Sequence, residues 1–152
     1  MSVLEIRGLT TAFQTARGEI AAIEEVDLDL AEGEILGIVG ESGSGKSVTA
    51  LTAMGLLPRP PARIVAGSVR FAGQELTTLP EAAMRRIRGP GMGMIFQEPM
   101  TSLNPVLTVG VQVAENVVRH TGAGWREAMD RAVEMLRLVR VPDPEQIGRA
   151  HV

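Results

Sequence analysis

Three features of the sequence predict an α/β fold with a mixed sheet. Residues 40–47 fit G-x-x-x-x-G-K-[ST], the pattern of a phosphate-binding loop between a strand and a helix. The apolar run 34–39 directly before this loop is typical of a buried parallel strand. Residues 3–9 and 26–30 alternate apolar and polar side chains, which predicts two antiparallel strands ahead of that core strand.

The middle of the chain adds further elements in order. Residues 10–17 are polar and Gly18 marks a turn, whereas residues 48–54 continue from the phosphate-binding loop as a helix. Another strand is predicted over 64–71, and a short helix over 80–88 with proline at its start. Residues 92–96 are expected to form a second buried strand. The arginines of the short helix are expected on a solvated face: Arg85, Arg86 and Arg88.

From Thr108 onward the pattern is helical. Thr108 is a typical N-cap, and the helix that follows it is expected to end at the glycines Gly122 and Gly124. A second helix is predicted over 125–139, where apolar side chains recur at helical spacing. Glu127 is four residues before Arg131 in this helix, which predicts an ion pair worth a few tenths of a kcal/mol.

The residue types of the loop at 40–47 suit the binding of phosphate groups. Glycines let the backbone bring its N–H groups close to phosphate oxygens, and the following helix directs about half a positive charge at the same anion. Lys46 supplies a compact charge for the β- and γ-phosphates, and the Ser47 hydroxyl is placed to bind Mg²⁺. Lys46 is the only lysine among 15 basic residues. We therefore expect a nucleotide site here.

Composition restricts the other possible functions. The formal net charge of −3 argues against nucleic acid as the main partner. The chain has no cysteine, so disulfides and thiolate metal sites are excluded. It has no apolar run long enough to span a membrane and no signal-peptide pattern at residues 1–7. A soluble, cytoplasmic chain is expected.

Residues 96–105, F-Q-E-P-M-T-S-L-N-P, together with the loop G-E-S-G-S-G-K-S, resemble the ATPase subunits of ABC transporters. The likeness is strongest to the branch that imports oligopeptides, dipeptides or nickel, and it extends to about Pro144. It implies a P-loop NTPase fold of the ABC type, truncated in this chain. Residues 1–98 would form a nucleotide-binding core with an antiparallel β-subdomain and an incomplete sheet. Residues 99–146 would form part of a helical subdomain.

The resemblance also implies roles for matching residues, with ATP and Mg²⁺ as cofactors. Phe13 would stack on the adenine. Gln97 would contact Mg²⁺ and the attacking water, and would relay the nucleotide state to the membrane subunit. Lys46 and Gln97 would be the catalytic residues, with Ser47 and Gln97 at the metal. The nucleotide would be bound by Phe13, Gly40, Glu41, Ser42, Gly43, Ser44, Gly45, Lys46, Ser47 and Val48.

The partners implied are a second ATPase subunit in a head-to-tail dimer, transmembrane permease subunits and, indirectly, a substrate-binding protein. The site of action would be the inner face of the plasma membrane, and no nucleic acid is expected. The family's signature motif, acidic Walker B strand, D-loop and switch histidine have no match in residues 1–152. The full-length parent is expected to hydrolyse ATP, and this fragment is expected to be inactive.

Two other readings remain open: a soluble ABC-type ATPase of DNA repair or translation, and a fragment that binds nucleotide without hydrolysing it.

The chain's last six residues, 147–152, can be encoded by ATC GGA AGA GCA CAC GTC, the start of a widely used short-read sequencing adapter. We expect these residues to be a non-native tail. Resequencing the locus tests this, and a genuine stop after Val152 would contradict it.

Overall fold

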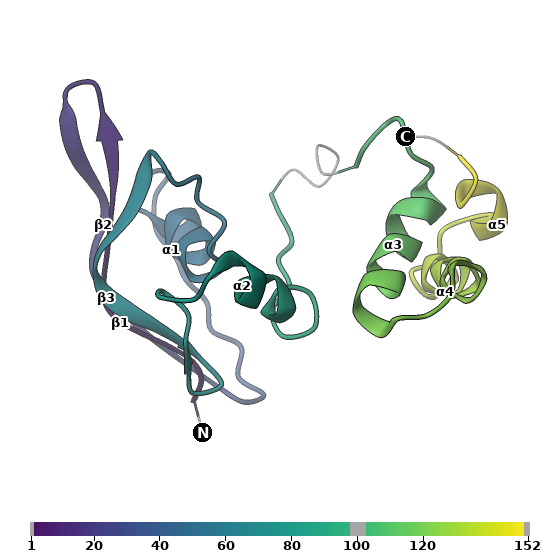
Figure 1. Cartoon of the computed structure of the whole chain (residues 1–152), viewed down its shortest axis with the longest axis horizontal. Helices are drawn as coiled ribbons and strands as arrows, with labels where there is room; N and C mark the ends of the chain where they lie inside the picture. Colours follow the sequence, from purple (N-terminus) through teal and green to yellow (C-terminus); the bar gives the residue numbers. More distant parts are fainter. Residues whose placement is uncertain (1, 98–102, 151–152) are drawn as a thin grey trace. The chain divides into compact units, whose positions relative to one another are not determined.

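The computed structural model describes residues 2–97 and 103–150 (Figure 1). The chain divides into two compact units, Met1–Arg88 and Gly89–Val152. Among the described residues, the first unit contains a sheet and two helices, and the second contains three helices. Each unit is described by itself.

The sheet of the first unit has the strand order β2-β1-β3-β4, and every neighbouring pair in it is antiparallel. Its strands are β1 (Ser2–Thr15), β2 (Gly18–Ala31), β3 (Ala62–Phe71) and β4 (Gln74–Glu75). The two antiparallel strands predicted from alternation are confirmed, and both are longer than predicted.

The polar stretch 10–17 does not end the first strand, because β1 continues through Thr15 and the turn follows at residues 16–17. In this stretch β1 pairs with β2 on one side and with β3 on the other, so its backbone groups find partners at both edges. Thr11 is fully buried, and its hydroxyl lies 3.3 Å from the Thr52 hydroxyl in the first helix. Tertiary pairing therefore outweighs local polarity here.

The parallel strands predicted over 34–39 and 92–96 are not formed. Neither segment has regular strand structure, and Ile35, Val39 and Ile95 are 97%, 93% and 93% exposed. A parallel strand needs a neighbouring strand to pair with, and among the described residues neither segment pairs with the sheet β2-β1-β3-β4. Within residues 2–97 and 103–150 the sheet is thus antiparallel throughout, and the predicted mixed sheet does not appear in that part of the chain.

Two helices pack with this sheet. Helix α1 (Lys46–Ala53) confirms the helix predicted after the phosphate-binding loop and starts two residues earlier. Helix α2 (Glu81–Ile87) confirms the short helix, with Pro80 at its N-cap. Ile6, Leu9 and Val69 of the sheet form the fully buried apolar centre of the unit. The solvated face predicted for the arginines of α2 is wrong for Arg88, whose side chain is only 19% exposed and pairs with Glu81 at 2.7 Å.

Glu81 gives the first unit a defined acid sensitivity. Hydrogen bonds from Arg88 and then Arg85 lower the pKa of the Glu81 carboxyl from its ordinary value of 4.5 to about 2. Between pH 4.5 and about pH 2, the native state therefore binds fewer protons than the unfolded chain. The stabilisation that the ionised Glu81 carboxylate gives the native state is complete above pH 4.5 and is lost as the pH falls to about 2.

We therefore expect the urea midpoint of the wild type to fall more between about pH 6 and about pH 3 than that of Glu81→Gln. The matched control is Glu24→Gln, which removes an exposed carboxylate of β2 that has no ion pair among the described residues. This control should follow the wild type. Equal pH dependence in Glu81→Gln and the wild type would contradict the assignment.

The second unit is built from α3 (Val109–Thr121), α4 (Trp125–Leu138) and α5 (Pro144–Ile147). The Thr108 hydroxyl accepts a hydrogen bond from the Val111 amide at 3.4 Å, which confirms the predicted N-cap. Gly122 ends α3 in the left-handed conformation, as predicted, whereas Gly124 belongs to α4 as its N-cap. Small side chains let α3 and α4 pack closely, and three of them are fully buried: Ala114, Ala128 and Ala132.

The predicted ion pair of Glu127 with Arg131 is wrong. Arg131 donates instead to Glu134 at 2.7 Å, one i,i+3 contact further along α4. Carboxylates at both spacings lie within reach of one arginine on a helix, and exposed pairs differ little in free energy. Local sequence therefore does not decide between them.

The segment after α5 lies against the start of α3. The Gly110 amide donates to the Gly148 carbonyl at 2.9 Å, and the Val109 amide donates to the Ala150 carbonyl at 3.0 Å. These bonds use backbone atoms only, so they depend little on which side chains follow α5. The origin of residues 147–152 stays a prediction, and residues 151–152 lie outside the described residues.

In the described parts of the chain, none of the helices has the length and apolarity that a bilayer crossing requires.

Candidate nucleotide-binding site

The phosphate-binding loop makes a tight turn that runs directly into α1. The Ser44 amide donates to the Glu41 carbonyl at 3.2 Å, and the Thr49 amide donates to the Gly45 carbonyl at 2.8 Å. Gly45 is the N-cap of α1 with φ +90°. The amino end of α1 therefore opens onto the loop, where backbone amides and the helix dipole favour an anion.

Lys46 is held by the loop that precedes it. Its Nζ donates to the Gly40 carbonyl at 2.7 Å, to the Glu41 carbonyl at 2.7 Å and to the Ser44 hydroxyl at 3.2 Å. No carboxylate pairs with this ammonium among the described residues. A fixed positive charge at the start of a helix is the arrangement that a phosphate group requires.

Gly45 is fixed by a contact with β2. A Cβ atom at this position would lie 2.5 Å from Ile23 Cγ2 and 3.1 Å from the Ala22 carbonyl oxygen. The loop therefore rests directly on the β2 backbone, and only glycine fits there. The motif predicts glycine at position 45 but not its neighbours, because Ala22 and Ile23 reach it only through tertiary packing.

Ser47 and Val48 follow Lys46 in the first turn of α1. Ser47 is exposed and Val48 is half-buried. An exposed serine hydroxyl beside bound phosphates fits Mg²⁺, which keeps several waters and takes few protein ligands. The described residues hold no cluster of three acidic, histidine or cysteine side chains that could bind a metal without phosphate.

Phe13 lies in the same unit as the loop. It is half-buried in β1, opposite Ile20 of β2 and Ala62 of β3. Thr11, two residues earlier, contacts Thr52 of α1, and side chains two apart on a strand share a face. The register between β1 and β2 shifts between Thr11 and Ala12, so this alternation does not fix the face on which Phe13 lies. Its stacking on adenine stays a prediction.

Gln97 lies in the second unit and is exposed. Because the two units are described separately, its approach to the nucleotide stays a prediction. The central part of the motif that carries the family resemblance, residues 98–102, lies outside the described residues. The structure thus brings together Lys46, Ser47, Gly45 and β2, and leaves the role of Gln97 to experiment.

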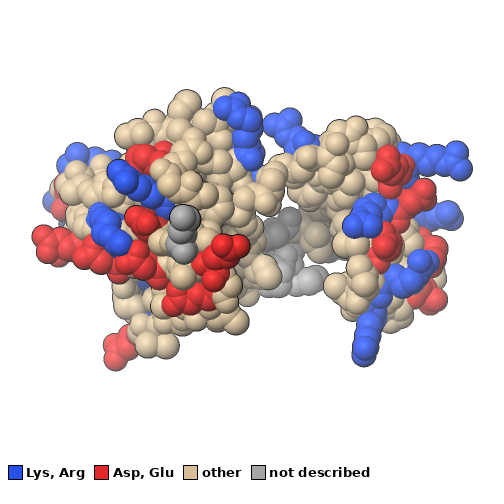
Figure 2. All heavy atoms as spheres, turned by 90° about the horizontal axis from the view of Figure 1, so that it is seen from below, with Lys and Arg blue, Asp and Glu red and all other residues tan. Residues whose placement is uncertain are grey.

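The charged side chains of the first unit include ion pairs between strands of the sheet. Figure 2 shows acidic and basic side chains interspersed over the face of each unit that it presents. Several are paired across strands: Arg7 with Asp29 at 2.5 Å, and Arg63 with Glu19 at 2.5 Å. The Arg63 hydrogen bond lowers the pKa of the Glu19 carboxyl.

Comparison with known proteins gives a consistent result. A family model described as "ABC transporter" matches residues 23–149. A putative peptide import ATP-binding protein of Brucella melitensis is 50% identical over 146 residues, which cover 93% of this chain and 43% of that protein. The oligopeptide transport ATP-binding protein OppD of Bacillus subtilis is 47% identical over 144 residues, 95% of this chain and 40% of OppD. The chain thus spans less than half the length of these relatives.

Solved structures show the same fold. The ATP-binding cassette MJ0796, in a dimeric post-hydrolysis state bound to ADP and Pi, matches with a TM-score of 0.81 at 25% identity. The match covers 97% of this chain and 61% of the cassette. The described architecture is therefore that of an ATP-binding cassette, of which this chain contains a part.

Proposed function

Because this chain belongs to the ABC transporter family, we propose that it is the N-terminal part of an ATP-binding subunit that energises peptide import. The observation that carries the proposal is the position of Lys46 at the amino end of α1, held by three oxygen atoms of its own loop. The names of the relatives, which include peptide and oligopeptide importers, support peptide as the cargo.

The position of Lys46 and Ser47 at the amino end of α1 supports binding of ATP with Mg²⁺ at this loop. The β- and γ-phosphates would lie over residues 40–47, where Lys46 can exchange carbonyl contacts for phosphate oxygens without moving far. When bound, Mg²⁺ would neutralise phosphate charge, and the Ser47 hydroxyl would be one of its ligands. Phe13 would cover the adenine from β1, and Gln97 would orient the attacking water.

The remaining parts of the mechanism belong to the whole protein. Two ATPase subunits would close head to tail, as expected for a relative of the dimeric cassette structures. Closure would drive permease subunits at the inner face of the plasma membrane, with a substrate-binding protein delivering the peptide. Positioning and charge neutralisation would supply most of the rate enhancement.

Peptide import is tested in the organism that carries the gene. We expect interruption of the reading frame to abolish growth on peptides as the sole source of a required amino acid. Growth on the free amino acid should be unchanged, and the intact gene should restore peptide growth. Normal peptide growth with lost nickel uptake would redirect the cargo to the metal. Sensitivity to DNA damage or a translation defect, with both uptakes normal, would favour the soluble ATPase.

A further inference from the structure

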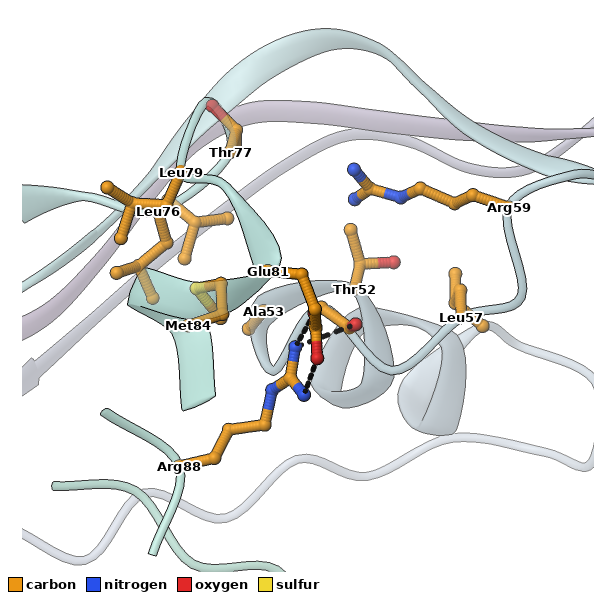
Figure 3. Close-up of a pocket in the computed structure, with 12 residues that line it drawn as sticks. Thr52, Ala53, Leu57, Arg59, Leu76, Thr77, Leu79, Glu81, Met84 and Arg88 are labelled. Carbon is orange, nitrogen blue, oxygen red and sulfur yellow. Dashed lines mark hydrogen bonds and ion pairs between the residues drawn. The ribbon is translucent and has the colours of Figure 1, made fainter. Parts of the chain in front are cut away.

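Arg88 makes the most extensive set of side-chain hydrogen bonds outside the phosphate-binding loop in the described part of the first unit. Its Nη1 and Nη2 donate to the two carboxylate oxygens of Glu81 at 3.0 and 2.7 Å. Its Nε donates to the Met54 carbonyl at 2.9 Å, and its Nη2 also lies 3.4 Å from the Gly55 carbonyl. Figure 3 shows the Arg88 and Glu81 side chains pointing toward each other beside α1.

The two carbonyls belong to the carboxyl end of α1. Met54 is the C-cap of this helix, and Gly55 follows it with φ +62°. The Leu56 amide returns to the Leu51 carbonyl at 2.8 Å, and the Gly55 amide returns to the Thr52 carbonyl at 3.0 Å, which together form a Schellman motif. The next two carbonyls, of Met54 and Gly55, face the guanidinium, at the end of the helix where a positive charge is most favourable.

Apolar packing and hydrogen bonds both join α2 to α1. A pocket of about 380 Å³ is lined by residues of α1, of the β3–β4 region and of α2, and both Arg88 and Glu81 line it (Figure 3). Met84 fills one side, with its Cε 3.3 Å from the position that a Cβ on Gly55 would take. Arg88 and Met84 therefore provide the direct connection between the two helices.

The contacts of Arg88 lie at the opposite end of α1 from the phosphate-binding loop. Helix α1 begins at Lys46, in the phosphate-binding loop, and ends at the carbonyls that Arg88 holds. Arg88 is the last residue of the first unit, and Gly89 begins the second. One helix of eight residues therefore lies between the phosphate-binding loop and the carbonyls that Arg88 contacts.

We propose that Arg88 is a positioning residue that fixes the start of segment 89–97 to the carboxyl end of α1, so that nucleotide binding at the loop orders this segment. The proposal rests on the proposed function, because the signal begins with ATP at residues 40–47. Glu81 acts with Arg88 by holding its guanidinium in the plane that reaches both carbonyls.

Hydrogen–deuterium exchange of purified residues 1–152, with and without Mg-ATP, tests the proposal. In the wild type we expect Mg-ATP to slow exchange in segment 40–47 and in segment 89–97. Arg88→Gln should retain the slowing at 40–47 and lose it at 89–97. The matched control is Arg85→Gln, because Arg85 donates to the same Glu81 carboxylate at 3.1 Å and makes no hydrogen bond to α1 among the described residues. This control should behave as the wild type.

Each outcome decides one question. Slowing at 89–97 that persists in Arg88→Gln, or is lost equally in Arg85→Gln, overturns the role of Arg88. Slowing at 40–47 but not at 89–97 in the wild type overturns the inference and leaves nucleotide binding intact. No slowing in either segment of the wild type contradicts both. Fast exchange of the sheet amides in Arg88→Gln would show that this variant does not fold. Glu81→Gln then replaces it, and slowing at 89–97 like that of the wild type in Glu81→Gln overturns the proposal.

Discussion

Gly45→Ala is expected to lower the free energy of unfolding of the first unit by about 2–4 kcal/mol and to abolish nucleotide binding. The added methyl group would lie 2.5 Å from Ile23 Cγ2, closer than carbon atoms approach without strain. The φ of +90° adds a backbone cost for any L-residue. Relief would require the loop to move away from β2, which would displace Lys46. Urea unfolding and Mg-ATP titration measure the two effects.

Gly43→Ala is the matched control for this variant. Gly43 has a similar φ of +83°, but a Cβ there would meet no atom within 4 Å. The control therefore carries the backbone strain without the contact, and we expect it to cost about 1–2 kcal/mol. Equal losses in the two variants would show that the contact between the loop and β2 contributes nothing.

Lys46→Ala is expected to weaken Mg-ATP binding by roughly 10–100-fold, because a hydrogen bond to a charged group contributes about 1.5–3 kcal/mol. The free energy of unfolding should change by less than about 0.5 kcal/mol, since the loop oxygens that accept from Lys46 are exposed and can bond to water. Calorimetric titration measures the affinity. Arg17→Ala, which removes an exposed charge at the β1–β2 turn, should leave the affinity unchanged. A comparable loss in Arg17→Ala would indicate a general charge effect instead of a phosphate contact.

Local patterns predicted those parts of the fold that local physics decides. The Thr108 cap, the end of α3 at Gly122 and the start of α2 after Pro80 follow from which residue satisfies a helix end or fixes φ. The phosphate-binding loop and its helix were predictable for the same reason. Its spacing places glycine where the backbone turns and lysine where the helix begins.

Long-range partners decide what the sequence did not predict. The run 34–39 has the composition of a buried strand, yet a strand forms only where neighbours accept its hydrogen bonds. Conversely, the polar start of residues 10–17 becomes the end of β1 because β2 and β3 flank it. The partial burial of Arg88 and the contact of Ile23 with Gly45 depend on elements brought together by folding, and no short-range pattern signals either.

ATP turnover by purified residues 1–152 is the most direct test of the central claim, that this chain holds the phosphate-binding half of an ABC-type site. Lys46 and Ser47 are present to bind nucleotide, whereas residues 1–152 contain no match to the family's acidic Walker B strand or signature motif. We predict weak Mg-ATP binding that depends on Lys46, and no turnover above the buffer rate. Turnover that Lys46→Ala abolishes would contradict the account.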